Sequence, residues 1–182
     1  MGGNRGGIAD FTARPRIGGG LLYWPHTLGE RGKGGKSVNT TIRVLRPDDA
    51  AAYRSVRRRA LIEHPEAYGS TVEELDSRSL EEVAATLAAP PELRCLFGAF
   101  VGGELAGLAG YGRAGNAKQR HRAGLYQMYT APEQRRCGLG RQLVDAVVAH
   151  ARSQDGVEEL ILAVTIGNTA AEQLYLAAGF RP

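Results

Sequence analysis

The stretch that decides the fold runs from Pro132 to Val144 and reads PEQRRCGLGRQLV. An apolar run, residues 125–130, precedes it and an amphipathic run follows it, so the pattern predicts a strand, a short turn and a helix. Gly138 and Gly140 stand where the chain must turn closely and leave its amides uncovered. Uncovered amides at a helix start, beside the positive end of the helix dipole and several arginines, predict a binding site for a phosphate group.

Two common phosphate-binding loops do not fit this stretch. A Walker loop requires Gly-Lys-Ser/Thr, but arginine and glutamine follow Gly140. A dinucleotide-binding fingerprint requires a third glycine where Leu143 stands. The pattern that remains, Arg135-x-x-Gly138-x-Gly140 after a strand, resembles the pyrophosphate loop of the GNAT superfamily of N-acetyltransferases. A nucleotide-binding α/β domain is kept as a third and weaker hypothesis.

A second segment strengthens the resemblance. Residues 159–166 are apolar and β-branched enough to form a buried strand. The chain then continues with a pattern that looks like the second signature of the family: Asn168-x-x-Ala171-x-x-Leu174-Tyr175-x-x-x-Gly179-Phe180. Both motifs occur in the order that the family has, which implies a GNAT domain over about residues 41–180.

The segments upstream agree with that plan. Capping and proline signals bound two helices, and a Gly-Gly pair joins two strands. The expected elements are a strand at 41–45, a helix from Asp49 to before Pro65, a helix from Ser79 to Pro90, strands at 94–101 and 104–111, and a polar loop at 116–122. The resemblance therefore implies an α/β (α+β) domain of the GNAT fold, a mixed and mostly antiparallel central sheet flanked by helices.

The end of the chain departs from the family pattern. GNAT domains continue past Gly-Phe with two more strands, whereas this sequence stops at Pro182. We therefore expect a C-terminally incomplete domain at residues 38–182, in which the strand at 160–166 has an exposed edge. Three explanations stay open: a shortened form or gene fragment, which we favour, a partner chain that covers the edge, and a natural loss of function.

Charge is divided unevenly along the 182 residues. The formal net charge is +4. Residues 1–37 hold six Lys/Arg against two Asp/Glu, and the remaining 145 residues hold 17 of each. The domain itself is therefore not basic, which argues against a nucleic-acid partner. The first 37 residues contain 11 glycines and little periodicity, so we expect a flexible Gly/Arg-rich segment outside the domain.

Several other classes find no support in the sequence. Residues 21–24 are too short for the apolar part of a secretory signal, and no apolar run reaches the length of a membrane span. Cys95 and Cys137 do not suggest a disulfide framework, and the four histidines lack metal-ligand spacing and are expected at the surface or in loops. We expect a cytoplasmic protein with no metal and no membrane partner, and leave homodimer formation open.

The resemblance implies acetyl-coenzyme A as the donor substrate. It implies that backbone amides of the phosphate loop hold the pyrophosphate, with charge added by Arg135 and Arg141. It also implies that the pantetheine arm pairs like an added strand with free backbone groups before the loop. The implied donor-binding residues are Met128, Tyr129, Thr130, Arg135, Arg136, Cys137, Gly138, Leu139, Gly140, Arg141 and Asn168.

The same resemblance implies two catalytic groups. The amide of Met128 would donate to the developing oxyanion, and Tyr175 would protonate the leaving thiolate. Each position also has a structural alternative: Met128 in an ordinary sheet ladder, Tyr175 as core packing. For Asn168 the structural alternative is a helix N-cap, a role that accounts for an asparagine at this position without a ligand.

The acceptor is left undefined. Residues 64–70 look like the acceptor-side loop of small GNAT enzymes. A general base is not assigned, because nothing selects among the available carboxylates: Glu73, Glu74, Asp76, Glu104, Glu158 and Glu159. We expect transfer of an acetyl group to a primary amine of a small molecule, peptide or protein. The alternative is a non-catalytic acyl-coenzyme A-binding module or an inactive fragment.

Overall fold

The computed structural model describes residues 7–14 and 39–182. In that part, six strands and five α-helices follow one another, with short 3-10 turns between some of them. The strands are β1 (Ile8–Ala13), β2 (Thr40–Val44), β3 (Arg94–Val101), β4 (Glu104–Arg113), β5 (Arg122–Thr130) and β6 (Glu159–Thr165). The helices are α1 (Ala50–Glu63), α2 (Val72–Asp76), α3 (Leu80–Leu87), α4 (Leu139–Ser153) and α5 (Thr169–Ala177), and the 3-10 turns are Pro47–Asp49, Pro65–Ala67 and Pro132–Gln134.

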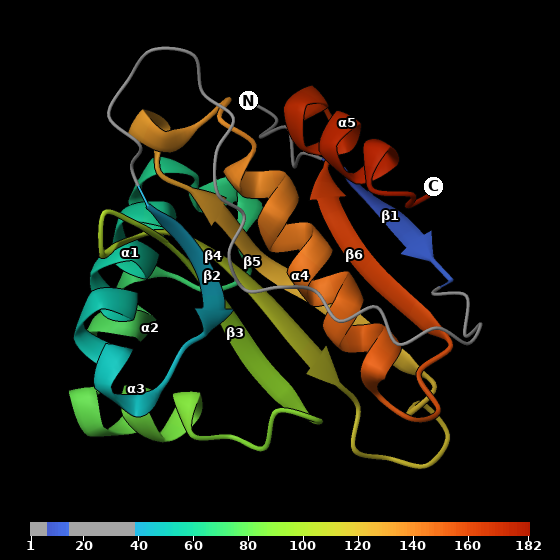
Figure 1. The fold of residues 1–182 in the computed structure, drawn as a ribbon, viewed down its shortest axis with the longest axis horizontal. Helices are drawn as coiled ribbons and strands as arrows, with labels where there is room; N and C mark the ends of the chain where they lie inside the picture. Colours follow the sequence, from blue (N-terminus) through green and yellow to red (C-terminus); the bar gives the residue numbers. More distant parts are fainter. Residues whose placement is uncertain (1–6, 15–38) are drawn as a thin grey trace, which may run out of the picture.

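The strands form one sheet with the order β1-β6-β5-β4-β3-β2 (Figure 1). Neighbouring strands run antiparallel except β5 and β6, which are parallel and are connected through α4. The predicted hairpin between β3 and β4 is present, and both of its glycines, Gly102 and Gly103, have positive φ. A mixed, mostly antiparallel sheet flanked by helices is the predicted fold class, and this prediction is confirmed.

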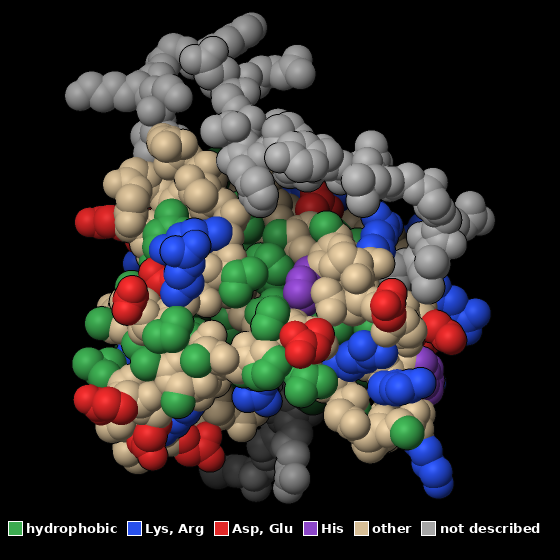
Figure 2. Space-filling view, turned by 60° about the horizontal axis from the view of Figure 1, so that its bottom comes forward, with side chains coloured by type: hydrophobic (Ala, Val, Ile, Leu, Met, Phe, Trp, Pro, Cys, Tyr) green, Lys and Arg blue, Asp and Glu red, His purple; other side chains and the backbone are tan. Residues whose placement is uncertain are grey.

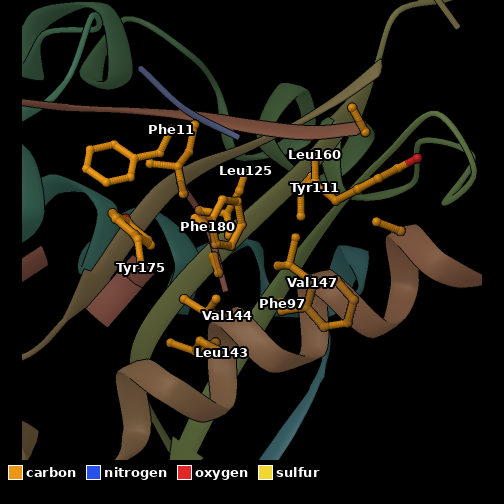
Figure 3. Close-up of a cluster of buried hydrophobic side chains, with 14 of the residues drawn as sticks. Phe11, Phe97, Tyr111, Leu125, Leu143, Val144, Val147, Leu160, Tyr175 and Phe180 are labelled. Carbon is orange, nitrogen blue, oxygen red and sulfur yellow. The ribbon is translucent and has the colours of Figure 1, made fainter. Parts of the chain in front are cut away.

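Helices cover both faces of the sheet. The amphipathic helix α4 places Leu143, Val144 and Val147, all fully buried, against the larger hydrophobic core (Figure 3). A smaller core forms on the opposite face, where α1 and α3 pack against side chains such as Leu96 and Leu108. Side chains alternate between faces along each strand, so neighbouring residues of one strand contribute to different cores.

Strand β1 corrects the expectation of an exposed edge at β6. Residues 8–13 lie within the segment that the sequence analysis placed outside the domain, yet they pair antiparallel with β6 from Ile8↔Thr165 to Ala13↔Leu160. Phe11 is buried and packs against Tyr175. The strand could not be recognised from sequence because it is short and lies in a segment rich in glycine and arginine. The rest of the proposed flexible segment lies outside the described residues.

The final residues also join the sheet. Arg181 forms an antiparallel bridge with Thr12, with backbone hydrogen bonds of 2.7 Å in both directions. Phe180 is fully buried and packs edge-on against Tyr175. The described chain therefore fills the place beside β6 with an N-terminal strand and then bridges that strand with its own C-terminus.

The structure agrees with some of the other local predictions and differs from others. The capping box at Ser79 and Glu82 is present, and the two cysteines are free thiols. The segment at 72–76, where the sequence analysis expected no helix, forms the short helix α2, because Thr71 and Glu74 make a second capping box. His150 is not a simple surface residue: its ring packs edge-on against Tyr111. In the described part of the chain, no helix is both long enough and apolar enough to cross a membrane.

Candidate active site

The parallel strands β5 and β6 pair over a short distance only. The register joins residues 122–124 of β5 to residues 159–161 of β6. Beyond that point β5 continues to Thr130 and β6 to Thr165 without further pairing. Backbone groups on the facing edges of the two strands are therefore available to a third partner.

A bulge in β5 lies at the same place. Tyr126 pairs with Gly110 and Tyr129 with Leu108, so Gln127 and Met128 together oppose a single residue of β4. Gln127 has φ of 54°, a left-handed conformation that is uncommon outside glycine. Bulges of this kind re-aim backbone groups and are frequent beside active sites. Met128 therefore has no register partner in either neighbouring strand.

The turn after β5 leaves the start of α4 open. Arg136 and Gly138 have positive φ, and Gly138 is the N-cap of α4. The first backbone hydrogen bond into the helix joins the Gln142 amide to the Gly138 carbonyl, at 3.1 Å. The amides from Gly138 to Arg141 donate to no other described residue, as expected for the first turn of a helix. Amides without an internal acceptor at the positive end of a 15-residue helix are groups that can hold an anion.

Gly140 brings this helix start close to the bulged strand. A Cβ atom at Gly140 would lie 3.4 Å from Met128 Cε and 3.5 Å from Leu174 Cδ2. The open amides, the bulge and α5 therefore meet at one end of the sheet, the arrangement that the sequence motifs required. Leu139, also predicted at this site, directs its side chain into the core and contributes only its backbone.

The arginines near the turn are engaged with other groups. Arg135 Nε donates to the Thr130 carbonyl at 3.0 Å, and Arg135 Nη2 lies 3.1 Å from His64 Nε2. Arg141 pairs with Asp145 one turn along α4 and donates to the Ala177 carbonyl. Exposed pairs of this kind are weak and exchange readily. Arg136 and Cys137 are exposed; the Cys137 thiol donates to the Gln134 carbonyl.

Asn168 and Tyr175 lie on α5 as predicted. Asn168 Oδ1 accepts from the Ala171 amide at 3.2 Å, so the asparagine is the N-cap of α5. The ring of Tyr175 is buried between Phe11 and Phe180. Its hydroxyl makes no hydrogen bond with another described residue and is not among the fully enclosed unpaired atoms, Arg57 Nη1 and Tyr111 Oη. Burial raises the pKa of Tyr175, with a further contribution from Tyr68, so the phenol keeps its proton at neutral pH.

The structure adds two tyrosines to the site: Tyr53 on α1, and Tyr68 in the 64–70 segment that resembles an acceptor-side loop. The Tyr68 hydroxyl donates to the Met128 carbonyl at 2.9 Å, and the Tyr53 hydroxyl donates to Gln127 Oε1 at 3.0 Å. Tyrosine side chains from the α1 side therefore hydrogen-bond to both bulge residues, Gln127 and Met128. Tyr53, an aromatic residue at helical spacing, resembles an ordinary core position, and nothing in the sequence of the loop indicates that Tyr68 contacts β5.

Glu63 is the carboxylate that the fold brings to β5. It accepts from the Tyr129 hydroxyl at 2.9 Å and pairs with Arg59. Burial alone raises the pKa of Glu63, but hydrogen bonds from Arg59 and Tyr129 outweigh it and leave the pKa lowered. Among the carboxylates considered from sequence, Asp76 pairs with Arg58 and Glu159 with Arg122, away from the bulge.

The stretch of β5 and β6 without mutual pairing lies beside the uncovered first turn of α4, in a mixed α/β domain. The sequence model of the acetyltransferase (GNAT) family matches residues 55–180, and the chain belongs to this family. Charge on the face shown in Figure 2 agrees with a domain that is not basic, because acidic and basic side chains are interspersed there.

Known proteins resemble the chain to different extents. It is 31% identical over 145 residues to a mycothiol acetyltransferase from Thermobispora bispora, covering 76% of this chain and 45% of that protein. The chain thus spans about half the length of this curated relative. A GNAT-family acetyltransferase from Streptococcus pneumoniae shares the fold with a TM-score of 0.71 at 24% identity, over 79% of this chain and 84% of that one. A PaiA N-acetyltransferase from Thermoplasma acidophilum, solved with coenzyme A, has a TM-score of 0.61 at 20% identity. The match covers 79% of this chain and 90% of that one.

Proposed function

We propose that the protein transfers an acetyl group from acetyl-coenzyme A to a primary amine. The observation that carries this proposal is the meeting of the bulge at Met128 with the open amides of Gly138 to Arg141. An elongated thioester with a diphosphate near one end suits that arrangement. The structural relative from Thermoplasma, which holds coenzyme A, supports the choice of cofactor.

The donor would lie along the unpaired edge of β5. The diphosphate accepts from the amides at the start of α4, and Arg135 and Arg141 add charge to the site. The pantetheine arm then pairs with the backbone of residues 128–130, and Asn168 contributes an amide contact from α5. In this arrangement the pantetheine amide replaces the Tyr68 hydroxyl, which donates to the Met128 carbonyl in the structure without donor.

The chemistry is a direct transfer. The amine nitrogen attacks the thioester carbon, and the carbonyl oxygen becomes an oxyanion that accepts from the Met128 amide. As the intermediate collapses, the C–S bond breaks and the sulfur takes a proton from Tyr175, while the nitrogen loses a proton to solvent. Burial raises the pKa of this phenol, so it stays protonated over the neutral range. The same shift makes it a weaker acid, and solvent returns the proton after each transfer.

The acceptor is an amine of a small molecule, peptide or protein. A mycothiol-type amine belongs among the candidates because the curated relative carries that name. A non-catalytic acyl-coenzyme A-binding module is the second candidate, since the open amides and the bulge would serve donor binding even without turnover. Cytoplasmic location and homodimer formation stay predictions.

Calorimetry with acetyl-coenzyme A tests the proposed donor site. Gly138→Val forces a β-branched residue into φ of 84° and closes the open turn, so we expect binding to weaken more than about tenfold. Gly103→Val is the matched control, because Gly103 has φ of 90° and equally open surroundings but lies in the β3–β4 hairpin. Equal affinity of both variants would contradict the assignment.

A thiol-release assay separates the two candidate functions. We expect release of coenzyme A to depend on an added amine when the full chain is tested against amino acids, polyamines, aminoglycosides, peptide N-termini and a mycothiol-type amine. Tight donor binding without amine-dependent release would favour the binding module.

A further inference from the structure

Arg57 on α1 is a buried cation without an anion. It is 3% exposed and is the one charged side chain among the described residues that is buried. Its Nη2 donates to Ser70 Oγ at 2.8 Å, while Nη1 is enclosed and has no hydrogen-bond partner. An enclosed, unpaired guanidinium group is costly for a folded protein, so its presence calls for an explanation.

The surrounding chain does not supply a counter-ion. None of the ion pairs formed by the described residues includes Arg57. The nearby carboxylates are used elsewhere: Glu63 pairs with Arg59, and Asp76 with Arg58. Burial lowers the pKa of Arg57, and the groups that oppose this effect are two phenols, Tyr53 and Tyr68, rather than carboxylates.

This cation lies next to the proposed transfer site. The Arg57 guanidinium stacks on the Tyr68 ring at 4.2 Å, and the hydroxyl of the same ring binds the Met128 carbonyl. Tyr53, one helical turn before Arg57, holds the other bulge residue, Gln127. One aromatic ring therefore separates the unpaired cation from the backbone that would hold the thioester.

Tyr68 connects donor binding to exposure of Arg57. In the proposed complex the pantetheine arm takes over the Met128 carbonyl, so the Tyr68 hydroxyl loses its partner. The ring belongs to a half-buried loop position and covers the guanidinium. Release of the ring would open Arg57 toward the space beside β5, where the acceptor amine must approach.

We propose that Arg57 binds a carboxylate of the acceptor, which makes amines that carry a nearby carboxylate, such as α-amino acids, the preferred substrate class. Guanidinium and carboxylate match in geometry and form paired, charge-assisted hydrogen bonds. The inference rests on the proposed function and predicts ordered binding, with the donor first.

Matched ligands test this inference in the presence of coenzyme A. Calorimetry on the full chain would compare N-acetyl derivatives of alanine, phenylalanine, methionine and threonine with the corresponding N-acetyl amino acid amides. We expect at least one acid to bind about 10- to 100-fold more tightly than its amide. We also expect this preference to disappear without coenzyme A.

Variants on the same helix assign the effect to one residue. Arg57→Gln should reduce the acid-to-amide ratio to about one while changing the coenzyme A affinity less than about twofold, and Arg57→Lys should restore part of the ratio. Arg58→Gln, at an exposed position of α1, is the control and should keep the ratio. The wild-type comparison needs no variant and stands even where Arg57→Gln does not fold.

The outcomes separate the two proposals. If coenzyme A does not bind, the proposed function fails and this inference fails with it. If coenzyme A binds but acids and amides bind alike, or neither binds, the proposed function survives and the carboxylate site is wrong. A preference that persists in Arg57→Gln would also overturn the assignment.

Discussion

The two faces of the sheet differ in what they bury. Beneath α4 the core is almost wholly apolar, and Leu143, Val144 and Val147 fill it (Figure 3). Beneath α1, next to β5, the chain buries a guanidinium group and the hydrogen-bonded phenols of Tyr53 and Tyr129. The contrast indicates that the α4 face contributes mainly apolar packing, while the α1 face near the bulge carries buried polar groups. Substitutions on the two faces should therefore affect different measurements.

The α4 face should show the largest loss of stability. Leu143 is fully buried, so Leu143→Ala should lower the free energy of unfolding by about 3–4 kcal/mol through lost burial and a residual cavity. Urea denaturation measures this change. Arg152→Ala, at an exposed position of the same helix, should stay within about 0.5 kcal/mol. Similar losses for both variants would contradict the assigned orientation of α4.

Strand β1 should behave as part of the α4-side core. Phe11→Ala removes a buried ring that packs on Tyr175, and we expect a loss of about 3 kcal/mol in the free energy of unfolding. Ile8→Ala on the same strand is the control, since Ile8 is 69% exposed. If Phe11→Ala has no effect on the urea midpoint, β1 does not occupy the edge of β6 in solution.

Tyr175 combines a packing role with a polar group in one side chain. Its ring is buried in the core, and its hydroxyl has no hydrogen-bond partner among the described residues. Tyr175→Phe keeps the ring, so stability and donor affinity should change little, whereas kcat should fall about 100-fold if the phenol protonates the thiolate. Thiol release at saturating donor measures kcat. An unchanged rate would remove the acid role and leave Tyr175 a packing residue.

Tyr68 should show a smaller effect in the opposite direction. Tyr68→Phe removes the hydroxyl that occupies the Met128 carbonyl, so acetyl-coenzyme A should bind about three- to fivefold more tightly. Calorimetry at one salt concentration gives the ratio. Weaker binding in the variant would mean that the hydroxyl contacts the donor instead of competing with it.

The α1 face should also give the molecule a mild sensitivity to alkaline pH. Burial raises the pKa of Tyr126 to about 12, so the unfolded chain releases this proton first as pH rises above about 10. Stability that is complete below pH 10 should therefore decline above it, by less than about 1 kcal/mol per phenol at pH 10.5. Urea midpoints at pH 8, 9.5 and 10.5 test the direction, and Tyr126→Phe should flatten the trend.

The order and type of most elements could be predicted from sequence because local signals determine them. Ser79 with Glu82 begins α3, and the glycine pair after Val101 makes the β3–β4 hairpin. The open turn at Gly138 followed from glycine spacing. These features depend on residues that are neighbours in the chain, where capping and turn chemistry are readable.

What could not be predicted depends on contacts between distant segments. Nothing near Phe11 indicates that it pairs with a strand some 150 residues later, at Leu162. The hydrogen bond from Tyr68 to Met128 and the stacking of Arg57 on Tyr68 arise only when α1 and the following loop pack beside β5. The pattern around Arg57 resembles a solvated helix face, because arginines follow it at positions 58 and 59. Tertiary packing decides which of the three consecutive arginines is buried.

The most direct measurement is a crystal structure of the protein with coenzyme A bound. We predict that the diphosphate oxygens accept hydrogen bonds from the amides of Gly138 to Arg141, and that the Met128 carbonyl has exchanged the Tyr68 hydroxyl for the pantetheine arm. Coenzyme A bound with its diphosphate elsewhere, and these amides left to water, would contradict the account.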